Sequence, residues 1–210
     1  MKRQFIKRIC SALIIFALLL TSFTSCNRSY DEEEVISAAK ELLKSAEKLN
    51  YIYFGEGIRY IDSDNAISVY KEADKAHLEE LGFDTVDELK ELTQKTFSSA
   101  YSQILYSTIL DTLRDGENIV GYKRYYYDEA KGIMMVNTSF KTLLYSTNVY
   151  NYDSIKVNGS KEDKVYLTVS STVINEKGKS KVVDLTITLI EEEVGWRLDN
   201  PVYANYSLRE

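Results

Sequence analysis

The sequence predicts an α+β fold in which N-terminal helices pack on one face of a C-terminal antiparallel sheet. Apolar residues recur every three or four positions between residues 31 and 113, and at every second position in the later part of the chain. The first spacing is typical of amphipathic helices and the second of half-buried strands. The composition, 44% hydrophobic and 28% charged, is that of a globular protein. We expect a single domain over residues 31–206.

The first 26 residues form a segment apart from that domain. Four basic residues near the start precede an apolar stretch from Ile9 to Leu20, and small hydroxyl residues then lead to Cys26. This order is typical of a secretory signal peptide. The stretch is shorter than the roughly 20 apolar residues that a membrane-spanning helix needs. We therefore expect residues 1–25 to be removed on export.

The junction carries a family resemblance. Phe23-Thr24-Ser25-Cys26 resembles the bacterial lipobox, although Phe23 stands where that motif usually has leucine or another aliphatic residue. The resemblance implies that Cys26 becomes the acylated first residue of the mature protein. Residues 26–30 would then tether the domain to the lipid bilayer, at the outer face of the cytoplasmic membrane. The alternative is that an ordinary signal peptidase cuts nearby and that Cys26 is incidental.

Cysteine count and charge narrow the class of protein. The other cysteine, Cys10, lies within the leader, so the mature domain would have no disulfide, CxxC pair or thiolate metal site. Removing the four basic leader residues leaves 22 basic against 32 acidic residues, a net charge of −10. This balance argues against nucleic acid as a partner. It favours a basic partner surface, although solubility explains it equally well.

The first helix is expected from Asp31 to about Asn50. Ser29 and Glu32 form a capping box, and the acidic residues beside them suit the positive end of the helix dipole. Apolar residues then recur at helical spacing from Val35 to Leu49. The aromatic segment 51–57 breaks this spacing, and its two glycines are expected to end the helix.

Two more helices are expected before the strands begin. Thr85 and Glu88 form a second capping box, ahead of a helix that reaches Phe97. A third helix follows Ser98-Ser99 and is expected to stop at Asp115-Gly116. The apolar residues expected to point inward from the third helix are Tyr101, Ile104, Leu105, Ile109 and Leu113.

Alternation marks the long strands. Apolar and polar residues alternate over 165–173 and again over 183–189. The polar, glycine-containing segments 175–179 and 191–195 are expected to be hairpin turns. A last strand with Trp196 and Leu198 would complete an antiparallel meander, and we expect Trp196 to be buried in it.

Candidate catalytic and metal-binding residues are few. His77 is the only histidine, and we interpret its charged, helical segment 73–80 as a solvated face. No motif places a nucleophile or an orienting partner beside it, so we expect no catalytic residue. Segment 62–65, Asp-Ser-Asp-Asn, resembles the start of a calcium loop, but Ala66 and Ile67 stand where an oxygen ligand and glycine belong. We therefore expect a polar turn, without a metal or a cofactor.

Tyrosine is the unusual residue, with 17 in the chain. Tyr122, Tyr125 and Tyr127 are candidates for a surface that contacts a sugar or a protein. The alternative is that tyrosines fill half-exposed sheet positions. Neighbouring residues on a strand point to opposite faces, so only some of this cluster can share one surface.

The order of motifs carries a second resemblance. The aromatic-glycine segment, Thr85-Val86-Asp87-Glu88-Leu89-Lys90, Tyr152–Val157 and Gly195-Trp196-Arg197-Leu198-Asp199-Asn200 together resemble IseA-type inhibitors of cell-wall DL-endopeptidases. They are also similar, more loosely, to NTF2-like and cystatin-like lipoprotein domains. The resemblance covers most of residues 30–206. It implies a non-catalytic envelope protein that binds another protein, with a cell-wall hydrolase as the partner.

Two alternatives stay open. The first is a small-ligand carrier with an NTF2-like pocket between helices and sheet. The second, an enzyme, would have to rely on paired carboxylates for acid and base catalysis.

Overall fold

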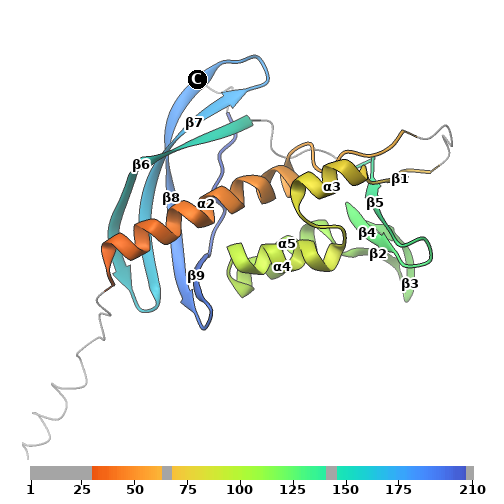
Figure 1. The fold of residues 1–210 in the computed structure, drawn as a ribbon, viewed down its shortest axis with the longest axis horizontal. Coiled ribbons are helices and arrows are strands. Elements are labelled where there is room, and N and C mark those ends of the chain that lie inside the picture. Colours follow the sequence, from red (N-terminus) through yellow and green to blue (C-terminus); the bar gives the residue numbers. More distant parts are fainter. Residues whose placement is uncertain (1–29, 63–67, 141–145, 207–210) are drawn as a thin grey trace, which may run out of the picture.

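The computed structural model describes residues 30–62, 68–140 and 146–206. The molecule is elongated, with a large sheet at one end, helices in the middle and short strands at the other end (Figure 1). The helices are α2 (Glu32–Phe54), α3 (Lys75–Leu81), α4 (Val86–Thr96) and α5 (Ser99–Ile109). The strands are β1 (Tyr70–Glu72), β2 (Thr112–Asp115), β3 (Asn118–Tyr122), β4 (Tyr125–Asp128), β5 (Ile133–Asn137), β6 (Ser146–Lys161), β7 (Lys164–Asn175), β8 (Ser180–Glu192) and β9 (Gly195–Leu198).

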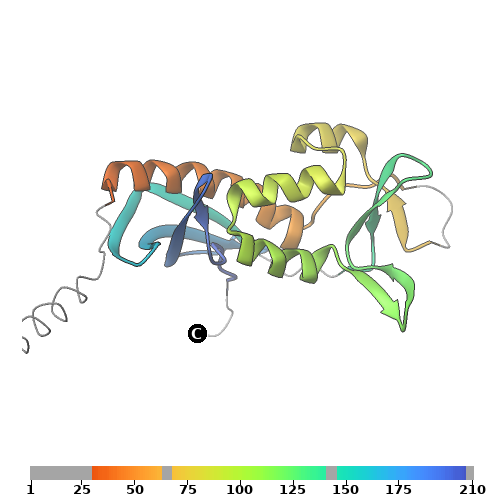
Figure 2. The same cartoon turned by 90° about the horizontal axis from the view of Figure 1, so that it is seen from below.

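The large sheet has the strand order β6-β7-β8-β9, and each neighbouring pair is antiparallel. Along β7, Val165, Leu167 and Val169 are buried, whereas the residues between them are half-buried on the other face. Helix α2 lies across the sheet, as Figures 1 and 2 show from two directions, and its apolar face joins the same core. The predicted α+β class, with helices before a C-terminal antiparallel sheet, is confirmed.

Helix α2 is longer than predicted. Asp31 is its N-cap and accepts hydrogen bonds from the backbone N–H groups of Glu33 and Glu34, while the predicted cap Ser29 lies outside the described residues. The helix continues through 51–54 to Gly55, because Ile52 and Tyr53 are fully buried and extend its apolar stripe by one turn. Burial of these side chains outweighs their modest helix propensity.

Helix α4 agrees with the prediction at both ends, with Phe97 as its C-cap, whereas α5 agrees only at its start. The capping box of Thr85 and Glu88 is present in both directions. Helix α5 ends at Ile109, and Gly116, with φ of 60°, belongs to the turn between β2 and β3. Leu113 therefore lies in a strand, and it is 42% exposed.

Ile104 was also predicted to point inward, and it is 58% exposed. The buried face of α5 is made by residues 101, 102, 105 and 109. At 100° per residue, position 104 lies about a third of a turn away from the centre of that face. The prediction followed a three-residue spacing from Tyr101 to Ile104, whereas the buried face follows the four-residue spacing to Leu105 and Ile109.

Segment 55–140 forms a second region that the sequence did not predict in this form. It contains the sheet β1-β5-β4 and the β2-β3 hairpin, both antiparallel and both far from the large sheet (Figures 1 and 2). These strands are short. β5 buries four consecutive residues, and β4 buries only Tyr125, so they show little of the alternation that marks β7.

Trp196 is half-buried and packs against the core, which agrees in part with the prediction of a largely buried ring. It lies in the edge strand β9 beside the turn at Gly195, where the ring of Tyr30 packs edge-on at 5.0 Å. Leu198, farther along the same strand, is fully buried. Its carbonyl accepts the Ser98 N–H, which joins the start of α5 to the sheet.

Candidate functional site

A groove of about 810 Å³ opens between the C-terminal half of α2 and the first residues of β6. The α2 side contributes Lys44, Glu47, Lys48, Asn50 and Tyr51, followed by Gly55 and Glu56. The opposite side contributes Ser146, Thr147, Asn148 and Tyr150 from β6, Ile174, Asn175 and Glu176 around the β7–β8 turn, and Tyr203. The groove is therefore mixed in character, with aromatic rings, amides and charged groups from four separate parts of the chain.

Asn50 is the unusual residue of this groove. Asn50 is 5% exposed, and its Nδ2 forms no hydrogen bond of ordinary geometry in the described part of the chain, although a weak contact with this amide opposes the rise in the pKa of the Tyr150 phenol that burial causes. A buried donor left unpaired costs about 1–3 kcal/mol. Asparagine is also a poor helix former. Packing alone therefore gives no reason for an amide at this position.

The C-terminal segment forms one wall and is held by side chains of β6. Alternation places Ser146, Asn148 and Tyr150 on the same face of the strand. The Tyr150 hydroxyl donates to the carbonyl of Val202, at 2.5 Å. Asn148 accepts from the N–H of Ala204, at 2.8 Å, and donates to its carbonyl, at 2.9 Å. These bonds fix the wall in place and leave Asn148, unlike Asn50, with its amide satisfied.

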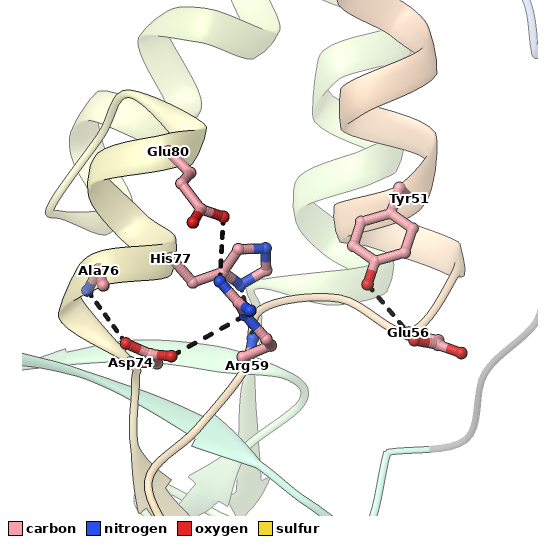
Figure 3. Close-up of polar contacts among 7 residues, drawn as sticks. All are labelled: Tyr51, Glu56, Arg59, Asp74, Ala76, His77 and Glu80. Atoms are coloured by element: carbon pink, nitrogen blue, oxygen red, sulfur yellow. Dashed lines mark hydrogen bonds and ion pairs between the residues drawn. The ribbon is translucent and has the colours of Figure 1, made fainter.

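Most charged groups of the groove already have partners. Lys44 donates to Glu41 at 2.7 Å, and Lys48 donates to the carbonyl of Leu81 at 3.0 Å. The Tyr51 hydroxyl contacts Glu56 at 3.4 Å (Figure 3). Partial burial raises the pKa of the Glu47 carboxyl, so its charged form lacks the solvation it would have in water.

His77 lies elsewhere, at the junction of α3 and the loop after α2. It is 8% exposed, so the interpretation of its segment as a solvated face is wrong at this residue. Its Nδ1 accepts the backbone N–H of Arg59 at 2.9 Å, and the Arg59 side chain pairs with Glu80 at 3.0 Å and with Asp74 at 3.9 Å (Figure 3). One face of α3 packs toward the core. The charged residues around His77 gave no indication of this in the sequence.

The environment of His77 gives it a structural role. Burial, followed by the nearby Arg59 charge, lowers the pKa of the imidazole. The neutral ring keeps Nδ1 as an acceptor for the loop, which is the contact that protonation would remove. A general base needs that lone pair for a substrate, and here the backbone holds it.

The three candidate tyrosines do not share a surface. Tyr125 is fully buried, and its hydroxyl donates to the carbonyl of Ile52 at 2.7 Å, so it cannot contact a partner. Tyr127 is half-buried and packs against the core. Tyr122 is half-buried and stacks on Tyr126 at 4.1 Å. Strand alternation separates Tyr126 from its two neighbours and turns Tyr125 inward.

A different aromatic cluster forms around Tyr122. Tyr70 meets Tyr126 edge-on at 5.3 Å, and its hydroxyl accepts from the Tyr122 N–H at 2.8 Å. Large apolar side chains are exposed on neighbouring β2 and β3, where Ile119 is 49% and Val120 is 63% exposed. We call Tyr70, Tyr122, Tyr126, Leu113, Ile119 and Val120 the distal patch, because β1–β4 lie at the end away from the large sheet (Figure 1).

The remaining expectations concern metal binding, the calcium-loop-like segment, Cys26 and membrane-spanning helices. Over residues 30–62, 68–140 and 146–206, no three His, Cys, Asp or Glu side chains are placed to hold a metal ion. Most of the calcium-loop-like segment falls in 63–67, outside the described residues, and Asp62 pairs with Lys71. Cys26 also lies outside them. No helix in the described ranges is long and apolar enough to cross a membrane.

Comparison with protein-family models, with curated proteins and with solved structures finds no match to this chain.

Proposed function

We propose that this protein is a membrane-tethered, extracytoplasmic lipoprotein that acts as a non-catalytic binding module, with the groove as its ligand site. The observation that carries the proposal is the buried Nδ2 of Asn50, which has no hydrogen bond of ordinary geometry to residues 30–62, 68–140 or 146–206, in a groove of about 810 Å³. Buried polar groups in native proteins are nearly always paired, and an unpaired one needs a reason. A ligand that accepts a hydrogen bond from Nδ2 supplies that reason.

The proposed tether suits this placement of the groove. Tyr30 lies four positions after Cys26, a stretch that an extended chain covers in at most about 14 Å. The first turn of α2 would then lie near the membrane. Asn50 lies 18 residues beyond Glu32, about 27 Å along the helix axis, so the groove would face the envelope space and not the lipid.

Replacing the acylated cysteine tests the tether. Two acyl chains hold a protein stably at a membrane, so Cys26→Ser should move most of the protein from the membrane fraction to the medium or the soluble envelope fraction. Fractionation with fatty-acid labelling measures both properties. An uncleaved, unlabelled wild-type chain in the membrane fraction would contradict this part of the proposal.

Side-chain amide resonances test the ligand site. The mature chain with Cys26→Ser is titrated with short peptides and with peptidoglycan saccharides, and ¹H–¹⁵N spectra are recorded. We expect shifts of the Asn50 side-chain amide and of residues 146–150, and none in the β2–β3 hairpin. If no probe moves the groove resonances, the proposed ligand site is wrong.

A second candidate function is regulation of a cell-wall hydrolase, as the IseA-type resemblance implies. The distal patch favours it, because exposed apolar side chains beside half-buried aromatic rings at one end of a protein are typical of protein-contact surfaces. On this candidate, the wild-type domain slows digestion of peptidoglycan by a purified DL-endopeptidase.

Two exposed valines give a matched pair for that assay. Val120 is 63% exposed in the distal patch, and Val182 is 70% exposed on β8 of the large sheet. Val120→Glu should abolish inhibition, whereas Val182→Glu should leave it unchanged. Absence of inhibition by the wild-type domain would remove this candidate.

A further inference from the structure

Resting on the proposed function, we infer that the groove takes an extended basic peptide, which offers a carbonyl to Asn50 and an amine or guanidinium group to Glu47 and Glu176. The inference goes beyond a general ligand site, because it states the charge and the chemical class of the ligand.

Acidic groups outnumber basic ones in the groove, with Glu47, Glu56 and Glu176 against Lys44 and Lys48. Both lysines are engaged, Lys44 by Glu41 and Lys48 by the carbonyl of Leu81, and the Glu56 carboxylate meets the Tyr51 hydroxyl. Glu47 and Glu176 line the same groove, and neither forms an ion pair or side-chain hydrogen bond with another residue in the described ranges. A cation can therefore enter without displacing an existing pair.

Glu47 would gain most from such a cation. Partial burial raises the pKa of its carboxyl, and this carboxylate also acts on the neighbouring phenols of Tyr150 and Tyr152. An amine beside it restores the stabilisation of the charged form that burial removes. An anionic ligand would meet the opposite effect, since like charges at short range are costly.

The remaining surfaces suit a peptide. Asn50 needs an acceptor, which a backbone carbonyl provides and a simple polyamine lacks. Tyr51, 38% exposed, and half-buried Tyr203 offer rings for the apolar stem of a lysine or arginine side chain and for its charge. The wall formed by residues 202–206 is fixed by β6, so the ligand meets a groove that is already shaped.

Calorimetry with three probes tests the inference on the mature chain with Cys26→Ser. The probes are acetyl-Ala-Lys-Lys-Ala-amide, the same peptide with both Nε groups acetylated, and spermidine. We expect the lysine peptide to bind, acetylation to weaken binding at least tenfold, and spermidine, which has amines but no carbonyl, to bind weakly. Affinity for the lysine peptide should fall as salt rises from 50 to 500 mM.

Charge-removing variants locate the contact. Glu47→Gln and Glu176→Gln should each weaken the lysine peptide several-fold without changing the melting temperature. Glu34→Gln, on the same helix but in its first turn, is the matched control and should bind as the wild type does.

The possible outcomes distinguish failure of the basic-peptide inference from failure of the proposed ligand site. Equal binding of both peptides, or binding of a peptidoglycan saccharide alone with shifts at Asn50, overturns the basic-peptide inference and leaves the ligand site standing. Binding of the lysine peptide that neither Gln substitution weakens also overturns it. Failure of every peptide and saccharide to move the groove resonances overturns the proposed function itself.

Discussion

The two ends of the molecule are held together by different means. In the large sheet, β7 and β8 alternate, and residues such as Leu167 and Leu189 fill the core from one face. In segment 55–140, buried polar side chains bind backbone carbonyls: Arg124 reaches Tyr53 and Gly55 at 2.7 Å each. Both ends contribute apolar residues to the core, and segment 55–140 depends in addition on a few buried anchors that join it to the end of α2.

This difference predicts different responses to mutation. Apolar cores tolerate conservative changes because each residue contributes a share of the buried area. When one side chain donates to several buried carbonyls, no other residue can replace it, since its loss leaves those acceptors unpaired. We therefore expect single substitutions at anchors of segment 55–140 to have the largest effects.

Removing the Arg124 anchor should have the largest effect. Arg124 is 4% exposed, and its guanidinium also lies over the Phe140 ring at 4.8 Å. Arg124→Met leaves two buried carbonyls at the end of α2 without donors, and we expect a loss of about 3–5 kcal/mol in the free energy of unfolding. Urea denaturation measures it.

Arg197 is the control from the large sheet. Its guanidinium also donates to backbone carbonyls, those of Gln94 and Trp196, but the residue is only half-buried. Arg197→Met should therefore cost less than about 1 kcal/mol, because water can replace the lost donors. Equal losses at Arg124 and Arg197 would contradict the distinction between the two ends.

Two glycines with positive φ sharpen the comparison. Gly57 has φ of 81°, and a Cβ there would lie 2.3 Å from Arg124 Nη2 and from the Tyr125 hydroxyl. Gly178, in the β7–β8 turn, has φ of 74° and open space around it. Gly178→Ala should cost about 1–2 kcal/mol from backbone strain alone. Gly57→Ala adds overpacking of about 1–3 kcal/mol.

Thermal and urea unfolding of the two variants give the excess at Gly57 directly. The excess should disappear when Gly57→Ala is combined with Arg124→Met, because the anchor that the new methyl group displaces is already gone. An excess that persists in the double variant would show that the anchor is not its cause.

The large sheet and α4 could be predicted because their signals are local. Alternation in 165–173 and 183–189 and the Thr85–Glu88 capping box each lie within a few residues, and each is confirmed. The short strands of segment 55–140 and the anchors that hold them could not be predicted in this way. These anchors join positions about 70 residues apart, and no spacing along the chain marks Arg124 as the partner of Gly55.

The groove was concealed for the same reason. Asn50 stood at the expected end of the first helix, where an asparagine is unremarkable as a cap. Only the extension of α2 to Phe54 buries it, and the strand opposite begins almost a hundred residues later at Ser146. The tyrosine-rich segment predicted a contact surface that included Tyr125, which is a core residue. It gave no indication of Tyr70, which belongs to the distal patch.

His77 predicts a smaller, pH-dependent effect in the anchored region. Its folded pKa lies below the usual value of about 6.5, so the unfolded chain binds more protons as pH falls. The contribution of His77 is complete above pH about 6.5 and declines as pH drops toward the folded pKa. We expect a loss of about 1 kcal/mol, the worth of one hydrogen bond to Arg59.

His77→Asn isolates this contribution, because asparagine can accept the same N–H bond without titrating. Unfolding free energies of the wild type and the variant are compared at pH 7.5 and 5.5. The difference between the two proteins should change in favour of the variant at the lower pH. A pH-independent difference would mean that His77 has the same pKa in the folded and unfolded chains, contrary to its environment.

The most direct measurement of the central claim compares Asn50 with Asn148. Both are buried in the groove, at 5% and 7% exposure, but only Asn148 has its amide satisfied. Asn50→Leu removes an unpaired donor worth about 1–3 kcal/mol, so it should leave the free energy of unfolding unchanged or raise it, while Asn148→Leu lowers it. In the same samples, calorimetry with acetyl-Ala-Lys-Lys-Ala-amide should show that Asn50→Leu abolishes ligand binding. A clear loss of stability in Asn50→Leu, with binding unchanged, would contradict a groove whose amide is kept for a ligand.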